Sequence, residues 1–539
     1  MTPSFALNAQ RFALLVLPIC ALISAVMLRQ QAGPFWLWSN LDPDYFYLFD
    51  SLNIINGNWP QHIAHPGTTV QMIGALVIKF MQPFSSTNEI NNLVLTNPEH
   101  YLIHINHTLI CIMAFVMWAA GWAALIVFGN LTGAILLQLG PFLSKLIFKH
   151  LTHVSPEPLL VCTMFMLATV MLLAVRPHEM DRRPFRYVFA FALVAGFGLA
   201  TKITSAGLYL MPLFLIARPK LLILYAIATV CATILFTFPA AGSYGLIFDW
   251  LVKITVAGDH FGSGAHRVIN TDLYLRNVFR VSSRPIFFVV LILGTISVAV
   301  AKLNSPLSQT SRALAGLCLA FAGQALLVGK HPAGHYMIPA LTSSGFGFLL
   351  LRQQIFNFFA SSRNIQIRVK YFFMILLTVL CVLQTRSLIQ LGNEFTDRTT
   401  QALAIDESPY SSCARIYFWP ASNNYYALFM GNYMTGNMFS KKLDQLYTDP
   451  AILIATPSGS LSSWTRESRG LDVAAHYNCI FARGERAEWK ENPVPHYVLP
   501  FDDTAFVDIK IKGVCNFGDE VIFTWGVECI PSRWCNCKK

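Results

Sequence analysis

Three aspartates near the start of the chain are the first residues whose type and position suggest chemistry. Asp42, Asp44 and Asp50 directly follow the first of many apolar segments. Because carboxylates are costly beside lipid, we interpret this stretch as a wet polar site at a membrane surface. A carboxylate shielded by apolar walls has a raised pKa and can accept a proton from a hydroxyl. The alternative is a set of solvated loop acids, with Asp44 as the N-cap of a helix starting at Tyr45.

A turn of composition His65-Pro66-Gly67-Thr68 follows and leads into a short apolar helix, predicted over 68–82. Proline and glycine favour the turn, and Thr68 or Thr69 can cap the helix. The N-terminus of a helix attracts anions such as phosphate. We therefore take His65 as a candidate substrate-binding residue, with a plain capped helix as the alternative.

A second basic turn lies between two later apolar segments and contains Lys330, His331, His335 and Tyr336. One cation and two imidazoles in a tight turn could hold a phosphate. The alternative is interfacial anchoring by Lys330 and Tyr336.

Three further charged residues stand where lipid would penalise an unpaired charge. Lys202 follows Gly198 and Ala200 at the end of a predicted span, and snorkelling is its alternative explanation. Glu157 opens another span, where it could equally be an acid that favours a helix start. Arg276 follows a Gly-rich loop at 258–267 that could act as a lid, and its guanidinium could pair with phosphate.

The composition is that of a polytopic membrane protein. Of 539 residues, 54% are hydrophobic and 12% are charged, whereas soluble domains contain about 25% charged residues. The net charge of +11 is explained by the Lys and Arg excess of membrane loops, so no nucleic-acid partner is expected.

We predict about eleven membrane-spanning helices, each long enough to cross the hydrocarbon layer. They are expected at 12–28, 101–128, 131–148, 157–175, 187–201, 203–217, 221–240, 284–301, 312–328, 337–351 and 371–386. The distribution of Lys and Arg among the loops places the N-terminus in the cytoplasm. Most histidines before residue 385 then fall on the outer face, which indicates a polar cavity there.

The chain changes character after residue 386, where apolar runs become short. We predict a transmembrane domain over 1–386 and an extracytoplasmic α/β domain over 387–539. A βαβ unit is expected from a strand at Cys413-Ala-Arg-Ile-Tyr-Phe-Trp, a helix at 424–433 and a strand at 451–455, with further strands at 505–511 and 520–525. The six cysteines of this region predict disulfides, without choosing a pairing.

The order of these features resembles the GT-C superfamily of membrane glycosyltransferases, which use polyprenyl-phosphate sugars. Protein O-mannosyltransferases and lipid A aminoarabinose transferases are members. The resemblance rests on Asp42 and Asp44 after the first span, the His65-Pro66 turn, Glu157, and the Gly198 to Lys202 segment. It also rests on the basic turn with Lys330, His331, Tyr336 and Pro339, and on an outer C-terminal domain.

The resemblance implies an inverting transfer of a sugar from a polyprenyl-phosphate carrier to an acceptor hydroxyl at the outer face of the inner (plasma) membrane. Asp44 is then the catalytic base, with Asp42 as the second choice. The partners are the lipid-linked donor, the bilayer, and a glycan, lipid or protein acceptor. No cofactor is required, and a divalent metal at Asp42 and Asp44 is an alternative that we do not favour.

Three other functions fit parts of the pattern. A transferase resembling O-antigen ligases would use a diphosphate-linked donor and rely on Arg instead of Asp44. A transporter or flippase would have charges in mid-membrane and symmetry between its halves. A non-catalytic assembly scaffold would depend on the C-terminal domain alone.

Overall fold

The computed structural model describes residues 10–37, 41–64, 66–258, 265–304, 306–418, 420–455, 461–462, 464, 477–485, 511–517 and 520–527. The chain forms two compact units. The helical unit comprises Met1–Leu28, Ile63–Ile73 and Ile105–Leu391. The mixed unit comprises Arg29–His62, Gly74–His104 and Gly392–Lys539. The predicted sites at His65 and in the loop 259–264 lie outside the described residues, as does the side chain of Asp42.

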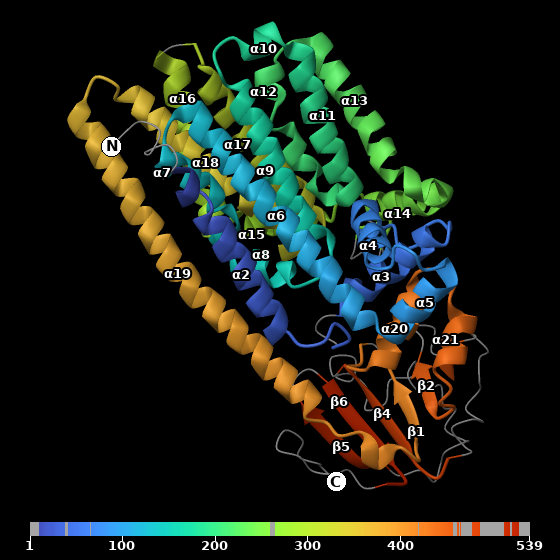
Figure 1. Ribbon diagram of the computed structural model, residues 1–539. Coiled ribbons are helices and arrows are strands. Elements are labelled where there is room, and N and C mark those ends of the chain that lie inside the picture. The colour runs from blue at the N-terminus through green and yellow to red at the C-terminus, as the bar shows by residue number, and fades with distance from the viewer. Residues whose placement is uncertain are drawn as a thin grey trace. The chain divides into compact units, whose positions relative to one another are not determined.

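Eight helices in the described part of the chain are long and apolar enough to cross a membrane. They are Gln10–Gln31, which contains α2 (Val16–Gln31), then α6 (Pro98–Phe128), α9 (Pro156–Ala174), α11 (Pro184–Thr201), Pro219–Val256, α16 (Pro285–Asn304), α17 (Gln309–Lys330) and Arg363–Tyr410, which contains α19 (Arg363–Leu403). Figure 1 shows several of them, α9, α11 and α17 among them, running side by side in the helical unit. Each coincides with a predicted span, and their length and composition are consistent with a membrane protein.

The count of eleven spans is not confirmed, because three predicted spans take another form. The segment predicted at 131–148 is interrupted by Gly140 and Pro141 and forms α7 (Leu131–Gln138), η1 (Gly140–Leu143) and α8 (Lys145–Leu151). Proline lacks the N–H that a helix interior needs. A side chain at Gly140 would also collide with the Thr342 carbonyl.

The segment predicted at 203–217 is likewise too irregular to be one spanning helix. It is a 3-10 helix, η2 (Ile203–Leu210), followed by the single turn of α12 (Leu213–Ile216). The segment predicted at 337–351 forms η5 (Gly334–Met337) and the buried helix α18 (Ile338–Phe358). Thr342, Ser343, Ser344 and Arg352 make α18 too polar to count among the eight.

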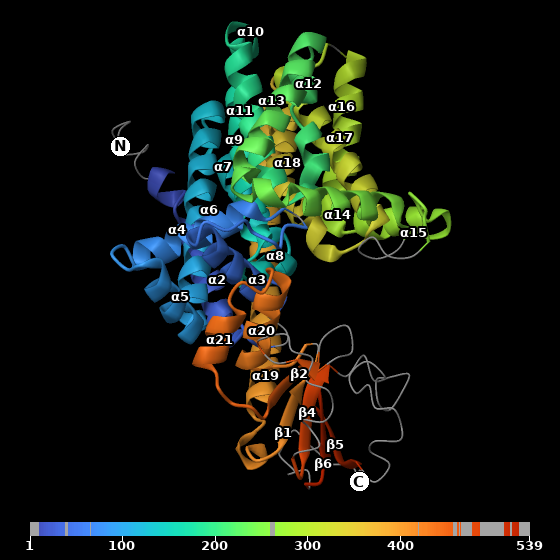
Figure 2. The ribbon, with the colours of Figure 1, turned by 90° about the vertical axis from the view of Figure 1, so that its right-hand side faces the viewer.

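The helices α14 (Tyr244–Val256) and α15 (Thr271–Ser282) lie across the direction of the long helices, as Figure 2 shows. The helix α13 (Pro219–Thr237) ends in η3 (Phe238–Ser243), and α14 (Tyr244–Val256) follows in the new direction. The second crossing helix, α15 (Thr271–Ser282), packs against α17. The one-turn helix α10 (Glu179–Arg182) joins α9 to α11.

The mixed unit combines helices of the first long loop with the C-terminal sheet. The helix α3 (Leu41–Ile55) packs on α20 (Asn424–Met434), and α5 (Thr87–Thr96) packs on α21 (Ser440–Leu446). The helix α4 (Thr68–Met81) passes from the helical unit into this one. The helix α19 continues past residue 386, where we had placed the domain boundary, and the short η6 (Ser408–Tyr410) follows it.

The sheet has the strand order β3-β2-β1-β4-β6-β5. Its strands are β1 (Ala414–Tyr417), β2 (Ile452–Ala455), β3 (Leu461–Ser462), β4 (Ile480–Glu485), β5 (Ile511–Phe517) and β6 (Glu520–Trp525). β1 pairs in parallel with β2 and β4, which confirms the predicted βαβ unit with α20 as its crossover. β6 is also found where it was predicted, whereas most of the strand predicted at 505–511 lies outside the described residues.

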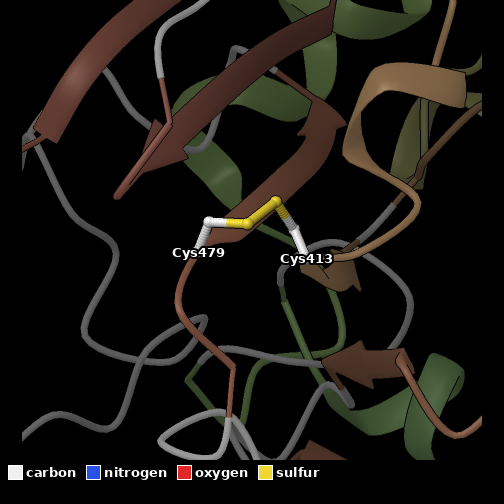
Figure 3. The surroundings of a disulfide bond; sticks show 2 residues. All are labelled: Cys413 and Cys479. Carbon is white, nitrogen blue, oxygen red and sulfur yellow. A yellow bond between two sulfur atoms is a disulfide. The ribbon is translucent and has the colours of Figure 1, made fainter.

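A disulfide stabilises the sheet internally, and a buried arginine ties the sheet to the end of α19. A disulfide joins Cys413, just before β1, to Cys479, just before β4 (Figure 3). Arg483 on β4 is buried and bonded to Glu520 on β6 at 3.0 Å and to Glu407 at 2.7 Å. It also donates to the Ala402 carbonyl at the end of α19 at 3.0 Å. The last turn of the longest helix is thus fixed to the sheet.

Candidate functional site

A buried ion pair lies at the centre of the candidate site in the helical unit. Lys202 Nζ lies 2.6 Å from Glu157 Oε1, and both side chains are about 95% buried. Glu157 is in the first turn of α9, where the helix dipole favours an anion. Lys202 follows α11 at the point where the chain changes to the 3-10 helix η2. The start of one helix and the end of another therefore hold the two charges together.

Aromatic and imidazole rings surround this pair. The ammonium of Lys202 lies 5.1 Å from the centre of the Tyr336 ring, within the range of a cation–π contact. The rings of His335 and Tyr336 are 4.3 Å apart, and those of His335 and His150 are 5.4 Å apart. We call Glu157, Lys202, His150, His335 and Tyr336 the ion-pair cluster. Four of these five were predicted as site residues, whereas His150 was not.

Burial keeps both histidines of the cluster neutral. Loss of hydration lowers the pKa of His150 to about 3, and the neighbouring Lys202 adds to the effect. Burial and the Lys202 charge likewise lower the pKa of His335 to about 4. A neutral imidazole carries one donor and one acceptor, so these rings can hydrogen-bond a ligand without adding charge. The cluster therefore contains one cation, one anion, two neutral imidazoles and the phenol of Tyr336.

The turn after His65 packs directly beside Lys202. Pro66 and Lys202 pair through an antiparallel backbone bridge, and the hydroxyls of Thr69 and Thr201 are 2.8 Å apart. Gly67 has φ +75°, a conformation that favours glycine. The prediction that Thr68 or Thr69 caps α4 is not supported, because Thr69 bonds Thr201 and the buried Thr68 hydroxyl has no hydrogen-bond partner among the described residues.

Close packing at Gly198 and the hydrogen bonds of the Gln324 amide fix the segments that carry Lys202 and Tyr336. A side chain at Gly198 would collide with the Tyr209 hydroxyl, so α11 and η2 approach as only glycine permits. Gln324, buried in α17, donates to the Thr204 carbonyl at 2.8 Å and to the Tyr336 carbonyl at 2.9 Å. It thereby ties the Lys202 segment to the Tyr336 segment. Sequence reasoning missed Gln324, although a polar residue inside an apolar span was the available signal.

A largely apolar cavity of about 380 Å³ adjoins the cluster. Tyr336 lines it, together with Thr204, Trp250 of α14 and Tyr274 of α15. A second, more polar cavity of about 230 Å³ has Asn270 and Asn277 among its lining residues. Lys330 and His331 line both cavities. The predicted basic turn thus stands where an apolar and a polar compartment meet.

Lys330 and His331 also have structural contacts that the phosphate interpretation did not foresee. Lys330 Nζ donates to the Thr255 carbonyl, and the His331 ring lies 3.2 Å from the Ile254 carbonyl. Both carbonyls belong to the last turn of α14, where cations offset the helix dipole. Arg276 on α15 is exposed and lines neither cavity.

The predicted base Asp44 belongs to the mixed unit. Helix α3 starts at Leu41, so Asp44 lies in its first turn and is not the N-cap of a helix beginning at Tyr45. Its side chain is fully buried and interacts electrostatically with Arg29. Glu99 also interacts with Arg29 and accepts a hydrogen bond from the Tyr45 hydroxyl at 2.9 Å. Glu99 and Tyr45 were not predicted as part of this site.

Asp50 has a structural role in the same unit. Its carboxylate accepts hydrogen bonds from the backbone N–H groups of Gln61 and His62 at 2.9 and 2.8 Å, and from the Asn53 amide at 2.9 Å. It thus fixes the end of the loop that precedes His65. Burial raises the pKa of Asp50 to about 7, against the opposing effect of these hydrogen bonds.

No family model, curated protein or solved structure matches this chain. Among the described residues, no group of three or more His, Cys, Asp or Glu is arranged to hold a metal ion. The case for function therefore rests on the geometry of the ion-pair cluster and its cavities.

Proposed function

We propose that this protein is a membrane glycosyltransferase that moves a sugar from a polyprenyl-phosphate carrier to an acceptor hydroxyl. The observation that carries the proposal is the position of Tyr336. Its ring covers the buried Lys202 ammonium and also lines the apolar cavity. A buried cation beside an apolar compartment, in a unit of membrane-spanning helices, suits a ligand with an anionic head and a long apolar chain.

The ion-pair cluster has the donors that a phosphate requires. An ammonium has three N–H donors, and Glu157 engages one of those of Lys202. Glu157 stabilises the buried charge before a ligand arrives, since an unpaired cation would be strongly destabilising there. A phosphate would then share the ammonium with Glu157, and the neutral imidazoles of His150 and His335 could donate to its oxygens.

The proposed reaction is a single displacement. The acceptor oxygen attacks the anomeric carbon and forms the new glycosidic bond, while the bond from that carbon to the phosphate oxygen breaks. The carrier leaves as polyprenyl phosphate, and the hydroxyl proton passes to a carboxylate, for which Asp44 is our candidate. Lys202 would stabilise the negative charge that develops on the leaving phosphate.

Transfer assays in membranes test this proposal. Membranes containing the wild type or a variant are supplied with labelled polyprenyl-phosphate sugars, and incorporation of label is measured. We expect Asp44→Asn and Lys202→Ala to abolish most transfer, while Lys302→Ala, a change of an exposed lysine in α16, leaves it unchanged. Transfer at the wild-type rate by both site variants would refute the site assignment.

The donor class is tested in the same membranes. A diphosphate-linked donor that is used in place of the monophosphate, with no loss in Asp44→Asn, would favour the ligase-like alternative. Movement of the labelled lipid across the bilayer without any sugar transfer would favour a flippase.

A further inference from the structure

A row of aromatic side chains in the mixed unit lies outside the β-strands and has no role in the proposed reaction. The rings of Tyr425 and Tyr447 are 5.3 Å apart, and Trp464 lies 5.7 Å from Tyr447. Phe429 continues the row at 6.4 Å from Trp464, and Tyr433 stacks on Phe429 at 6.0 Å. We call these five residues the aromatic platform. Tyr425, Phe429 and Tyr433 belong to α20, Tyr447 directly follows α21, and Trp464 comes shortly after β3.

The platform has a buried layer and a half-buried layer. Phe429 and Trp464 are at least 92% buried and support the rest. Tyr425, Tyr433 and Tyr447 are each half-buried, with part of each side chain open to solvent. The indole N–H of Trp464 donates to the Tyr447 carbonyl at 3.1 Å, which holds the two rings in place. A rigid aromatic surface that is partly open to solvent is a recognition surface of low entropic cost.

Hydrogen-bonding groups adjoin one end of the platform. The Tyr447 hydroxyl interacts with the Asn424 side chain, and Asn424 Oδ1 lies 3.1 Å from the Tyr45 hydroxyl. Tyr45 in turn bonds the half-buried carboxylate of Glu99. The amide of Asn424 therefore stands beside the aromatic rings, and the buried Tyr45 connects it to the carboxylate of Glu99.

This combination suits the chemistry of a sugar. The C–H face of a pyranose ring packs on an aromatic ring, while its hydroxyls bond amides and carboxylates. A cage for a quaternary ammonium needs rings separated by the width of the cation. Here the neighbouring centroids are 5.3 to 6.4 Å apart, so the rings contact one another and leave no such space.

We propose that the aromatic platform binds a carbohydrate chain. This inference does not depend on sugar transfer, because binding can be measured with no donor present. If the proposed transfer reaction is correct, the platform would hold a glycan acceptor, and the acceptor class would be a saccharide instead of a protein or a lipid.

Binding of soluble oligosaccharides by the purified full-length protein tests the proposal. The probes are cellotetraose, maltotetraose and N-acetylchitotetraose, measured by titration calorimetry in detergent, with tetramethylammonium as a control ligand. We expect saturable binding of at least one oligosaccharide and none of tetramethylammonium. Absence of binding by all three oligosaccharides, or binding of the ammonium ion alone, would overturn the proposal.

Variants separate an aromatic surface from a merely structural one. Tyr447→Leu and Tyr425→Leu keep apolar bulk but lose the ring, and we expect each to weaken binding by about tenfold. Tyr447→Phe keeps the ring and loses the hydroxyl, with its bond to the Leu95 carbonyl and its interaction with Asn424, so its affinity should stay close to that of the wild type if the ring is what binds. Trp59→Ala changes a half-exposed tryptophan of the same unit outside the platform, and should bind normally.

A footprinting measurement on the wild type removes any dependence on variant folding. The bound oligosaccharide should protect Tyr425 and Tyr447 from hydroxyl-radical oxidation more than it protects Trp59. Equal protection of all three, or leucine variants that fold and bind like the wild type, would show that the platform is only part of the hydrophobic core.

Discussion

Pro66 and Lys202 are neighbours through a backbone bridge, although they belong to two motifs far apart in the chain. The first motif is the turn that enters α4, and the second ends α11. The Thr69 and Thr201 hydroxyls, 2.8 Å apart, extend the same contact. Since Lys202 also holds Glu157, the bridge determines where the buried charge sits.

The bridge predicts a specific effect of Gly67→Ala. Alanine at a positive φ costs about 1 kcal/mol, because its Cβ is crowded in the left-handed region. Gly57, with φ +74° and open space where an added methyl group would stand, provides a control with the same backbone strain. We expect both alanine variants to lower the free energy of unfolding, whereas only Gly67→Ala should reduce sugar transfer. Equal transfer by the two variants would contradict a role for the bridge.

The Lys202–Glu157 pair predicts a difference between single and double variants. Removing one partner leaves an uncompensated buried charge and should destabilise the protein by about 3–5 kcal/mol. Replacing both by Met should restore most of the stability, because buried pairs often contribute little net stabilisation. Thermal unfolding in detergent measures the stability of the single and double variants. If Lys202 binds the donor phosphate, the double variant is stable and inactive; a stable double variant that retains transfer would show that the pair is structural only.

The course of the spans could largely be predicted from sequence, for a physical reason. Apolar length alone determines which helix can cross a bilayer, and all eight candidate helices were predicted from it. The three spans that are not confirmed lie where local chemistry interrupts an apolar run. Gly140-Pro141 breaks one helix, and the hydroxyls and arginine of α18 make another too polar.

The candidate site could be predicted only in part. Glu157, Lys202, His335 and Tyr336 stood out because charge or polarity near lipid is rare, and they do lie together. The grouping of residues 29–62 and 74–104 with the C-terminal sheet could not be predicted, because it depends on packing such as Phe49 against Phe439. Such contacts between distant apolar side chains leave no periodic signal in the sequence.

The neutral histidines predict that the helical unit loses stability in acid. The folded-state pKa values of about 3 for His150 and about 4 for His335 lie below the ordinary value of 6.5. The unfolded chain therefore binds protons first, and stability falls as pH decreases from about 6.5 to 4, by up to about 1.4 kcal/mol per pH unit for each histidine. His335→Gln should flatten this dependence in thermal unfolding curves. A profile as steep as that of the wild type would exclude His335 as a cause.

The Arg483 network predicts a large effect of a single buried substitution. Glu520→Gln removes one charge opposite Arg483, and the amide nitrogen can no longer accept one of the two guanidinium hydrogen bonds that the carboxylate receives. We expect a loss of about 3 kcal/mol or more in the free energy of unfolding. The exposed pair Arg218–Asp181 offers the control, since Asp181→Asn should change stability by less than about 1 kcal/mol. Similar losses in the free energy of unfolding for the two changes would mean that the Arg483 network stabilises the protein no more than an exposed ion pair does.

Asp50 predicts a pH dependence of the opposite sign. Its pKa in the folded protein, about 7, lies above the ordinary value of 3.8, so the folded state binds the proton more tightly than the unfolded state. The contribution of Asp50 to the stability of the mixed unit should therefore fall as pH rises from about 4 to 7, by up to about 1.4 kcal/mol per pH unit, and then level off. Asp50→Asn removes the titrating group but places an NH₂ opposite the N–H of Gln61 or His62, both of which donate to the carboxylate. It should thus be less stable than the wild type at every pH and lack the decline between pH 4 and 7.

Proteolysis of the 58–64 segment, followed over this pH range, reports on the loop that Asp50 holds. Cleavage that depends on pH equally in both proteins would show that Asp50 does not control the loop.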